Sequence, residues 1–286
     1  PMHLRMTSDR QRDYAIRVHL PQAHAPAAGY PVIWLLDVPT TWAPMQHALH
    51  ESGANDIAVI GIGWDVDKDG VDPNLRRRDF TLPARHEVPP PRGGDGHWRE
   101  DGDADAFLRF LTGTLQPHCL AELPLDPRRQ TLVGHSLSGL FALHALVARP
   151  LAFQRYVAAS PSIWWDRCRL LQELDRADWP AMRAARVLLS VGSEEQTAGP
   201  EKPAAIDGEA HAATLGELHM IANAGALGER LRAQQVDCRF ELFEGEGHRT
   251  VLPAAMATAL EFAQGMTETR AHASMRSRAD HTCGSA

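Results

Sequence analysis

Ser136 stands in a setting that suits a nucleophile. It lies in the motif Gly-His-Ser-Leu-Ser-Gly at residues 134–139, between an apolar run at 130–133 and a helix-like run at 140–148. A sharp strand-to-helix turn lined by small residues exposes a serine hydroxyl and directs the helix N-terminus at the reacting oxygen. Ser138 occupies a position where glycine is usual, but serine is nearly as small. The motif predicts acyl-transfer chemistry on Ser136.

Two later apolar runs end in residues that would complete this chemistry. Residues 187–191 lead into Glu194 and Glu195, and residues 240–243 lead into a loop that ends at His248. A histidine can accept the serine proton, and a carboxylate can fix the tautomer of that histidine. We therefore predict His248 as the general base. Glu194 and Glu195 are both candidates for the acid.

The remaining apolar runs indicate the elements that must position these residues. Runs at 32–36 and 57–62 are continuous, as in strands covered on both faces, whereas residues 14–20 alternate like a half-exposed edge strand. Helix-period stretches intervene at 106–115, 137–148, 220–235 and 253–264. This alternation predicts an α/β fold with a mostly parallel, doubly wound sheet and helices on both faces.

The domain organisation follows from length and local composition. One domain over residues 1–267 is the simplest interpretation of a 286-residue chain. Residues 193–215 are rich in Ala, Gly, Glu and Pro, and we expect either a lid over the site or an insertion there. Residues 268–286 form a polar C-terminal tail.

Charge and hydropathy restrict the partners. The formal net charge of −7 argues against a nucleic-acid or membrane-surface binder. No run reaches the roughly eighteen apolar residues of a membrane span, and the first twenty residues do not resemble a signal peptide. We expect a small-molecule partner and a cytoplasmic protein, or a periplasmic one if an export signal has been removed. The oligomeric state is left open.

No cofactor or metal is predicted. The cysteines at 119, 168, 238 and 283 are scattered and are expected to be reduced thiols. The acidic stretch at 101–105 begins like a calcium loop, but Thr112 stands where a bidentate glutamate is required. Gly61-Ile62-Gly63 lacks the third glycine of a dinucleotide fingerprint, because Val66 occupies that position.

Five segments together resemble the esterase group of the α/β-hydrolases, and within it the enzymes that hydrolyse enterobactin-type siderophore trilactones. They are Tyr-Pro-Val-Ile-Trp-Leu-Leu-Asp at 30–37, Arg-Arg-Arg-Asp-Phe-Thr at 76–81, the serine motif extended to 134–143, Ser-Pro-Ser-Ile-Trp-Trp at 160–165, and Gly-Glu-Gly-His at 245–248. The resemblance implies an α/β-hydrolase fold. It also implies a serine esterase that cleaves a catecholate siderophore, with iron only as part of the substrate. A general carboxylesterase or acyl-thioesterase, and a siderophore-binding protein with weak catalysis, are the alternatives.

The resemblance also implies roles for single residues. Glu195 matches the family's carboxylate and Glu194 is second, while a serine–histidine dyad without an acid, as in some siderophore hydrolases of this type, is the alternative. The backbone N–H groups of Leu137 and Val38 match the oxyanion hole, although Val38 replaces the family's usual glycine.

Four further side chains are candidates for substrate binding. Guanidinium groups suit an anionic siderophore, and indole rings can stack on catechols, although at least one of the two tryptophans is expected in the core. For the arginines, pairing with Asp79 and neighbouring carboxylates is the structural alternative. The four residues are Arg76, Arg78, Trp164 and Trp165.

Overall fold

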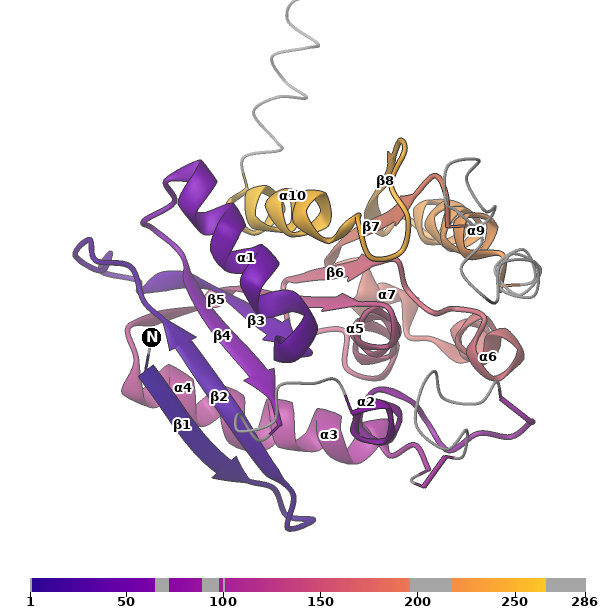
Figure 1. Ribbon diagram of the computed structural model, residues 1–286, viewed down its shortest axis with the longest axis horizontal. Coiled ribbons are helices and arrows are strands. Elements are labelled where there is room, and N and C mark those ends of the chain that lie inside the picture. Colours follow the sequence, from indigo (N-terminus) through magenta and orange to yellow (C-terminus); the bar gives the residue numbers. More distant parts are fainter. Residues whose placement is uncertain (1, 65–71, 89–97, 100, 196–217, 266–286) are drawn as a thin grey trace, which may run out of the picture.

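The described part of the chain is built on one eight-stranded sheet (Figure 1). The computed structural model describes residues 2–64, 72–88, 98–99, 101–195 and 218–265. The strand order is β1-β2-β4-β3-β5-β6-β7-β8; β2 is antiparallel to both its neighbours, and all other pairs are parallel. The predicted mostly parallel sheet is therefore confirmed. The strands are β1 (Met2–Thr7), β2 (Asp13–His19), β3 (Tyr30–Leu36), β4 (Ala58–Gly63), β5 (Leu125–His135), β6 (Arg155–Ala159), β7 (Arg186–Gly192) and β8 (Asp237–Phe243).

Helices cover both faces of this sheet, as Figure 1 shows. One face packs on α1 and α10, and the other on the helices between β4 and β5 together with α5 and α9. The helices are α1 (Val38–Ser52), α2 (Pro73–Phe80), α3 (Ala104–Phe110), α4 (Gln116–Glu122), α5 (Leu137–Ala148), α6 (Trp165–Glu173), α7 (Trp179–Met182), α9 (Met220–Ala233) and α10 (Leu252–Gln264). A π-helical turn, Leu111–Leu115, joins α3 to α4, and a 3₁₀ turn, Leu174–Arg176, follows α6.

The continuous apolar strands form the centre because both of their faces are covered. In β3 every residue is buried, and successive side chains enter different clusters: Trp34 lies with α5, whereas Ile33 and Leu35 lie with α1 and α10. Alternation of side chains along a strand makes this division unavoidable. Side chains of β3 therefore contribute to both hydrophobic cores, one on each face of the sheet.

The edge of the sheet differs from the prediction. Residues 14–20 were expected at the edge, but β2 is the second strand and β1 lies outside it. Every residue of β1 is exposed or half-buried, so its sequence lacks the apolar run by which strands are recognised. The helix expected at 106–115 begins at Ala104 and passes into the π-helical turn at Leu111.

The carboxyl ends of four parallel strands meet at one edge. His135 pairs with Ala159, Ala159 with Ser190, and Gly192 with Phe243. Ligands of open α/β sheets bind in the crevice outside these ends. The residues that follow β5, β6, β7 and β8 are therefore brought together, although they are far apart in the sequence.

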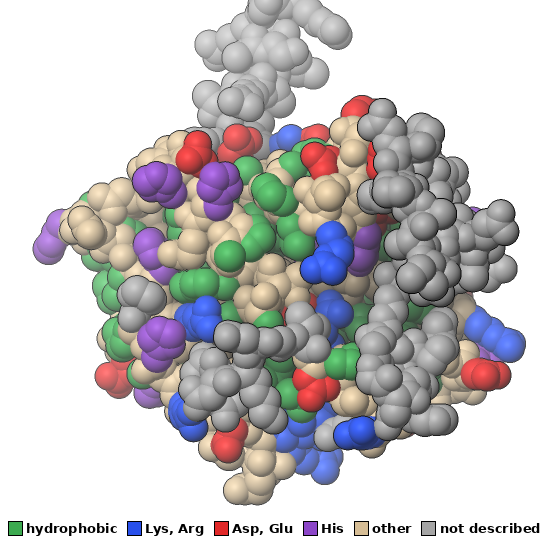
Figure 2. All heavy atoms as spheres, in the orientation of Figure 1, with side chains coloured by type: hydrophobic (Ala, Val, Ile, Leu, Met, Phe, Trp, Pro, Cys, Tyr) green, Lys and Arg blue, Asp and Glu red, His purple; other side chains and the backbone are tan. Residues whose placement is uncertain are grey.

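The described surface carries side chains of mixed character. On the face drawn in Figure 2, charged side chains of both signs are interspersed with hydrophobic ones. Among the helices that the structure describes, none combines the length and the apolar character that crossing a membrane requires. Cys119, Cys168 and Cys238 are free thiols. The tail at 268–286, and the predicted lid or insertion beyond Glu195, lie outside the described residues.

Candidate active site

The turn between β5 and α5 holds Ser136 in a conformation that non-glycine residues rarely adopt. Its φ and ψ are 61° and −119°, and its N–H donates to the carbonyl of Ala159 at 2.9 Å. Strained backbone of this kind persists where the surrounding structure enforces it. A Cβ at Gly134 would come 2.1 Å from the carbonyl oxygen of Ser138, so the first position of the motif requires glycine. The hydroxyl of Ser138 donates to the carbonyl of His135 and accepts from its N–H, both at 2.8 Å, which explains why serine fits the glycine position.

Ser136, His248 and Glu195 lie in one line of hydrogen bonds. Nε2 of His248 is 3.0 Å from Oγ of Ser136, and Nδ1 of His248 is 2.7 Å from Oε2 of Glu195. The carboxylate is 1% exposed, and its Oε1 accepts from the N–H of Gly192 at 2.8 Å and from the hydroxyl of Ser160. These contacts join His248 to Glu195. For the second candidate, Glu194, the backbone N–H donates to the carbonyl oxygen of Glu246.

The loops that carry Glu195 and His248 are packed directly on each other. A Cβ at Gly192 would come 2.1 Å from the carbonyl oxygen of Glu246, and the N–H of Gly245 donates to Oγ of Ser193 at 2.9 Å. His135 supports the same loop, because its Nε2 donates to the carbonyl of His248 at 2.9 Å. Burial, and the nearby His248 and Arg76, lower the pKa of His135 well below its ordinary value. His135 therefore acts as a neutral donor.

Two helices begin beside this line, and each begins at a residue predicted for the oxyanion hole. Val38 is the first residue of α1 and Leu137 the first residue of α5. N–H groups in the first turn of a helix have no partner within the helix, and the helix dipole makes that end positive. Two such N–H groups can stabilise an oxyanion.

Valine is accommodated at residue 38 by glycines on the neighbouring strand. A Cβ at Gly61 would lie 2.8 Å from Cγ2 of Val38 and 2.7 Å from the ring of Trp42, and a Cβ at Gly63 would lie 3.0 Å from Cβ of Val38. Larger residues on β4 would displace the start of α1. The glycines of Gly61-Ile62-Gly63 thus make room for the side chains of α1.

An ion pair ties the residue before Val38 to helix α2. Asp37 has a left-handed φ of 61° and is fully buried, and its Oδ2 lies 2.9 Å from Nε of Arg76. Burial raises the pKa of Asp37, and the Arg76 guanidinium opposes that effect. Arg76 therefore helps to fix Asp37, the residue directly before helix α1. Arg78 is buried and pairs with Asp79 through Nε at 2.7 Å and Nη2 at 3.0 Å, which favours the structural alternative for this arginine.

The two candidate tryptophans differ in exposure. Trp165 is only 5% exposed, whereas Trp164 is half-buried. Directly after them, Asp166, Arg167 and Cys168 have left-handed φ values of 49°, 56° and 57°. Three consecutive residues in this region carry backbone strain that neighbouring contacts must offset.

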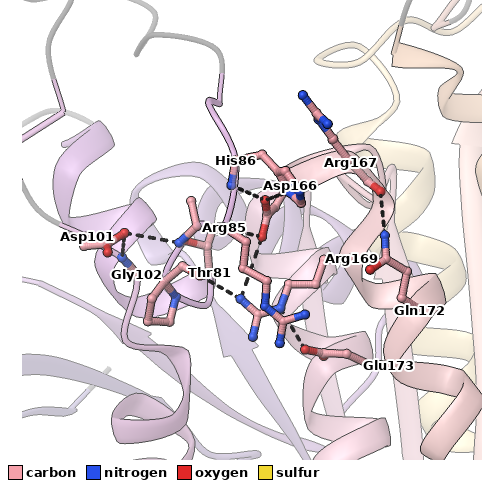
Figure 3. A network of polar contacts seen from close by, with 12 residues as sticks. Thr81, Arg85, His86, Asp101, Gly102, Asp166, Arg167, Arg169, Gln172 and Glu173 are labelled. Atoms are coloured by element: carbon pink, nitrogen blue, oxygen red, sulfur yellow. Dashed lines mark hydrogen bonds and ion pairs between the residues drawn. The ribbon is translucent and has the colours of Figure 1, made fainter.

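Asp166 supplies contacts that hold this strained segment (Figure 3). Its carboxylate accepts from the N–H groups of Arg85 at 3.1 Å and His86 at 3.0 Å, and it lies 2.9 Å from Nδ1 of His86. Burial raises the pKa of Asp166, but these hydrogen bonds outweigh burial and hold the pKa below its ordinary value. Asp166 thereby fixes the Trp164–Trp165 segment against residues 85–86.

The arrangement of serine, histidine, acid and two helix N-termini is that of an acyl-transfer site. Residues 7–263 match the family described as "Putative esterase". The chain belongs to this esterase family.

Named relatives of the esterase match from half to most of its length. The ferri-bacillibactin esterase BesA of Bacillus subtilis (strain 168) is 34% identical over 277 residues, which cover 91% of this chain and 88% of the relative. A siderophore enterobactin esterase of Emericella nidulans is 39% identical over 162 residues, covering 51% of this chain and 50% of the relative. Among solved structures, the siderophore hydrolase EstA from Aspergillus nidulans matches with a TM-score of 0.78 and 27% identity, covering 93% of this chain and 94% of that one.

The esterase also contains site neighbours that sequence reasoning did not identify. Ser160 and Ser162 precede the two candidate tryptophans in the Ser-Pro-Ser-Ile-Trp-Trp segment, and both hydroxyls contact the line of Ser136, His248 and Glu195. The repeat of serine on either side of Pro161 was the available signal. Asp37 was visible at the end of an apolar run, directly before Val38.

Proposed function

We propose that this esterase hydrolyses the ester bonds of a catecholate siderophore trilactone, with Ser136, His248 and Glu195 as its catalytic triad. The observation that carries the proposal is the hydrogen-bonded line of these three residues in a chain whose relative over 91% of its length is a ferri-bacillibactin esterase. Iron belongs to the substrate in this proposal. No step of the ester hydrolysis is assigned to it.

In the first step Oγ of Ser136 attacks the ester carbonyl. Because the Glu195 carboxylate accepts from Nδ1–H of His248, Nε2 is the bare nitrogen and accepts the Ser136 proton. The resulting imidazolium faces a carboxylate that is fully buried, where charge pairing is strong. It then protonates the leaving alkoxide, which stays attached to the rest of a cyclic substrate.

The carbonyl oxygen becomes an oxyanion during this attack. The N–H groups of Leu137 and Val38 are the proposed donors, because both begin helices next to Ser136 and are rigidly placed by α5 and α1. Fixed donors stabilise the charge as it develops and need no reorganisation. In the second step water attacks the acyl carbon and gives a proton to Nε2 of His248. This proton passes to Oγ of Ser136 as the bond from the carbon to Oγ breaks and the carboxylic acid leaves.

The substrate is proposed to lie between the strand ends and the Trp164 segment. Of the two candidate tryptophans, Trp164 is the more exposed, and its ring is the proposed surface for stacking on a catechol. The side chain of Arg76 is 16% exposed while its Nε pairs with Asp37. Its positive charge suits an anionic catecholate ligand.

Product analysis tests the proposal. Iron-free and ferric enterobactin are each incubated with the wild type and with Ser136→Ala, and linear and monomeric catechol-serine products are separated. We expect product formation by the wild type alone. Cleavage of p-nitrophenyl esters without siderophore cleavage would instead indicate a general carboxylesterase. Tight siderophore binding without products would indicate a binding protein.

A further inference from the structure

The loop after β6 contacts two members of the proposed triad through two serines that are separated by one proline. Ser160 donates its hydroxyl to Oε1 of Glu195, and Oγ of Ser162 lies 3.3 Å from Oγ of Ser136. Ser160 is fully buried and Ser162 is 2% exposed. Both hydroxyls are thus enclosed within the site, where water does not compete for them.

The backbone places the two hydroxyls. The N–H of Ser160 donates to the carbonyl of Ser190 at 2.6 Å, and the N–H of Ser162 donates to the carbonyl of Ser136 at 3.2 Å. Ser160 has a left-handed φ of 43°, and the ring of Pro161 fixes the following φ. The short segment therefore runs from the strand of the acid to the turn of the nucleophile, and it is anchored at both ends.

The direction of the hydrogen bond between the two serines follows from their neighbours. Ser136 has one hydroxyl proton, and Nε2 of His248 accepts it because Nδ1 carries a proton toward Glu195. In the contact with Ser162, Oγ of Ser136 can then only accept. Ser162 is the donor.

The length of this contact bears on its function. At 3.3 Å it exceeds the usual 2.7–2.8 Å of hydroxyl hydrogen bonds, so it is weak while Ser136 is a neutral alcohol. A hydrogen bond strengthens when its acceptor gains negative charge, and only interactions that are stronger in the transition state than in the ground state accelerate a reaction. Oγ of Ser136 gains charge as its proton passes to His248.

We propose that Ser162 is a further catalytic residue, whose hydroxyl donates to Oγ of Ser136 when this oxygen carries charge. In acylation the bond from Oγ to the acyl carbon forms while the Ser136 proton moves to Nε2 of His248, and the bond from that carbon to the ester oxygen then breaks as this proton passes to the leaving alkoxide. In deacylation a water oxygen bonds to that carbon and its proton passes to Nε2. The bond from carbon to Oγ then breaks as this proton moves to Oγ. Ser162 keeps its own proton throughout.

The inference rests on the proposed function, and Ser162→Ala tests it because this variant removes the hydroxyl and retains the backbone N–H. The first measurement is the rate of covalent labelling by a fluorophosphonate probe, which reports attack by Oγ alone. The second is kcat/KM for p-nitrophenyl butyrate. We expect both to fall together by about 5- to 30-fold, the factor that corresponds to loss of one hydrogen bond. Thermal unfolding checks that the variant is folded.

Ser162→Thr and Ser52→Ala are the matched variants. The threonine restores a hydroxyl and should recover labelling to within about threefold of the wild type, as rescue by a retained donor requires. Ser52 is the last residue of α1, at the end of the helix remote from Val38, and its change to alanine should leave labelling unaltered. Ser162→Ala that labels at the wild-type rate would overturn the inference, as would equal slowing of the alanine and threonine variants. Failure of the proposed triad would appear differently, as labelling of the wild type that persists in Ser136→Ala.

Discussion

Replacing Glu195 by glutamine tests the proposed acid without changing its size. In the wild type, Oε2 accepts from Nδ1–H of His248, and Oε1 accepts from Gly192 and Ser160. Glutamine offers one oxygen and one NH₂ group, so one of these two positions must become a donor. If the NH₂ group faced Gly192, two N–H groups would oppose each other in a buried site, at a cost of about 1–3 kcal/mol.

The less costly arrangement directs the NH₂ group at His248. Nδ1 must then lose its proton and accept, and the proton moves to Nε2. This tautomer cannot accept from Ser136, although it leaves the hydrogen bonds at Gly192 and Ser160 intact. A wrong histidine tautomer in a serine triad lowers kcat about 10⁴-fold. We expect a loss of about 10³–10⁴ in kcat, or roughly 4–5.5 kcal/mol of transition-state stabilisation, with a Tm within a few degrees of wild type.

The assay is hydrolysis of p-nitrophenyl butyrate, with Tm measured on the same samples. Glu194→Gln is the matched control, because it makes the identical change one residue earlier, where the backbone bonds to Glu246. The reasoning is refuted if Glu195→Gln retains activity within tenfold of wild type. It is equally refuted if Glu194→Gln is as damaging, since the acid would then have been assigned to the wrong residue.

Three further predictions concern the groups around the triad. Gly61→Ala should lower the free energy of unfolding by about 1–3 kcal/mol and reduce kcat, because the added Cβ would overlap Trp42 and displace Val38. Denaturant unfolding measures the first effect, and p-nitrophenyl ester hydrolysis measures the second. Arg76→Met should leave Asp37 buried without its ion pair and cost about 3 kcal/mol at neutral pH. A carboxyl whose folded pKa is raised binds its proton more tightly in the folded state, so the Tm deficit of this variant should be largest at high pH and narrow as the pH falls. Asp166→Asn should loosen the Trp164 segment and lower kcat/KM about tenfold for the siderophore but little for p-nitrophenyl acetate, and equal losses on both substrates would contradict this role.

The sequence was sufficient to predict the central strands and to indicate which proposed site residues follow the strand ends. There are physical reasons for this. Strands buried on both faces must be apolar throughout, so β3 and β4 were visible as continuous runs. The turn at Ser136 requires a glycine at residue 134, which leaves a recognisable motif. In parallel strands such motifs point to one edge, so their order along the chain carries spatial information.

Other elements could not be predicted because their stability comes from contacts distant in sequence. Strand β1 is held by pairing with β2 while its side chains stay largely exposed, and β6 has only five residues, so neither shows a strong pattern. Helix α1 contains Pro44, a residue that normally argues against a helix interior. The partner of Arg78 lies next to it in the chain, but the sequence does not show that Asp79 is buried between Trp64 and Arg78, which favours a structural role for the pair.

The choice between Glu194 and Glu195 shows what the folded arrangement adds. The two residues are neighbours of the same type, so composition and spacing cannot distinguish them. The donors around them can, because Gly192 and Ser160 both donate to Oε1 of Glu195, and Oε2 accepts from His248. A carboxylate fixed in this way presents its acceptor in one direction and determines which histidine nitrogen carries the proton. The hydroxyl of Ser160 therefore influences the proton on His248 without touching it, and Ser160→Ala should weaken the discrimination between the two tautomers that the whole site depends on.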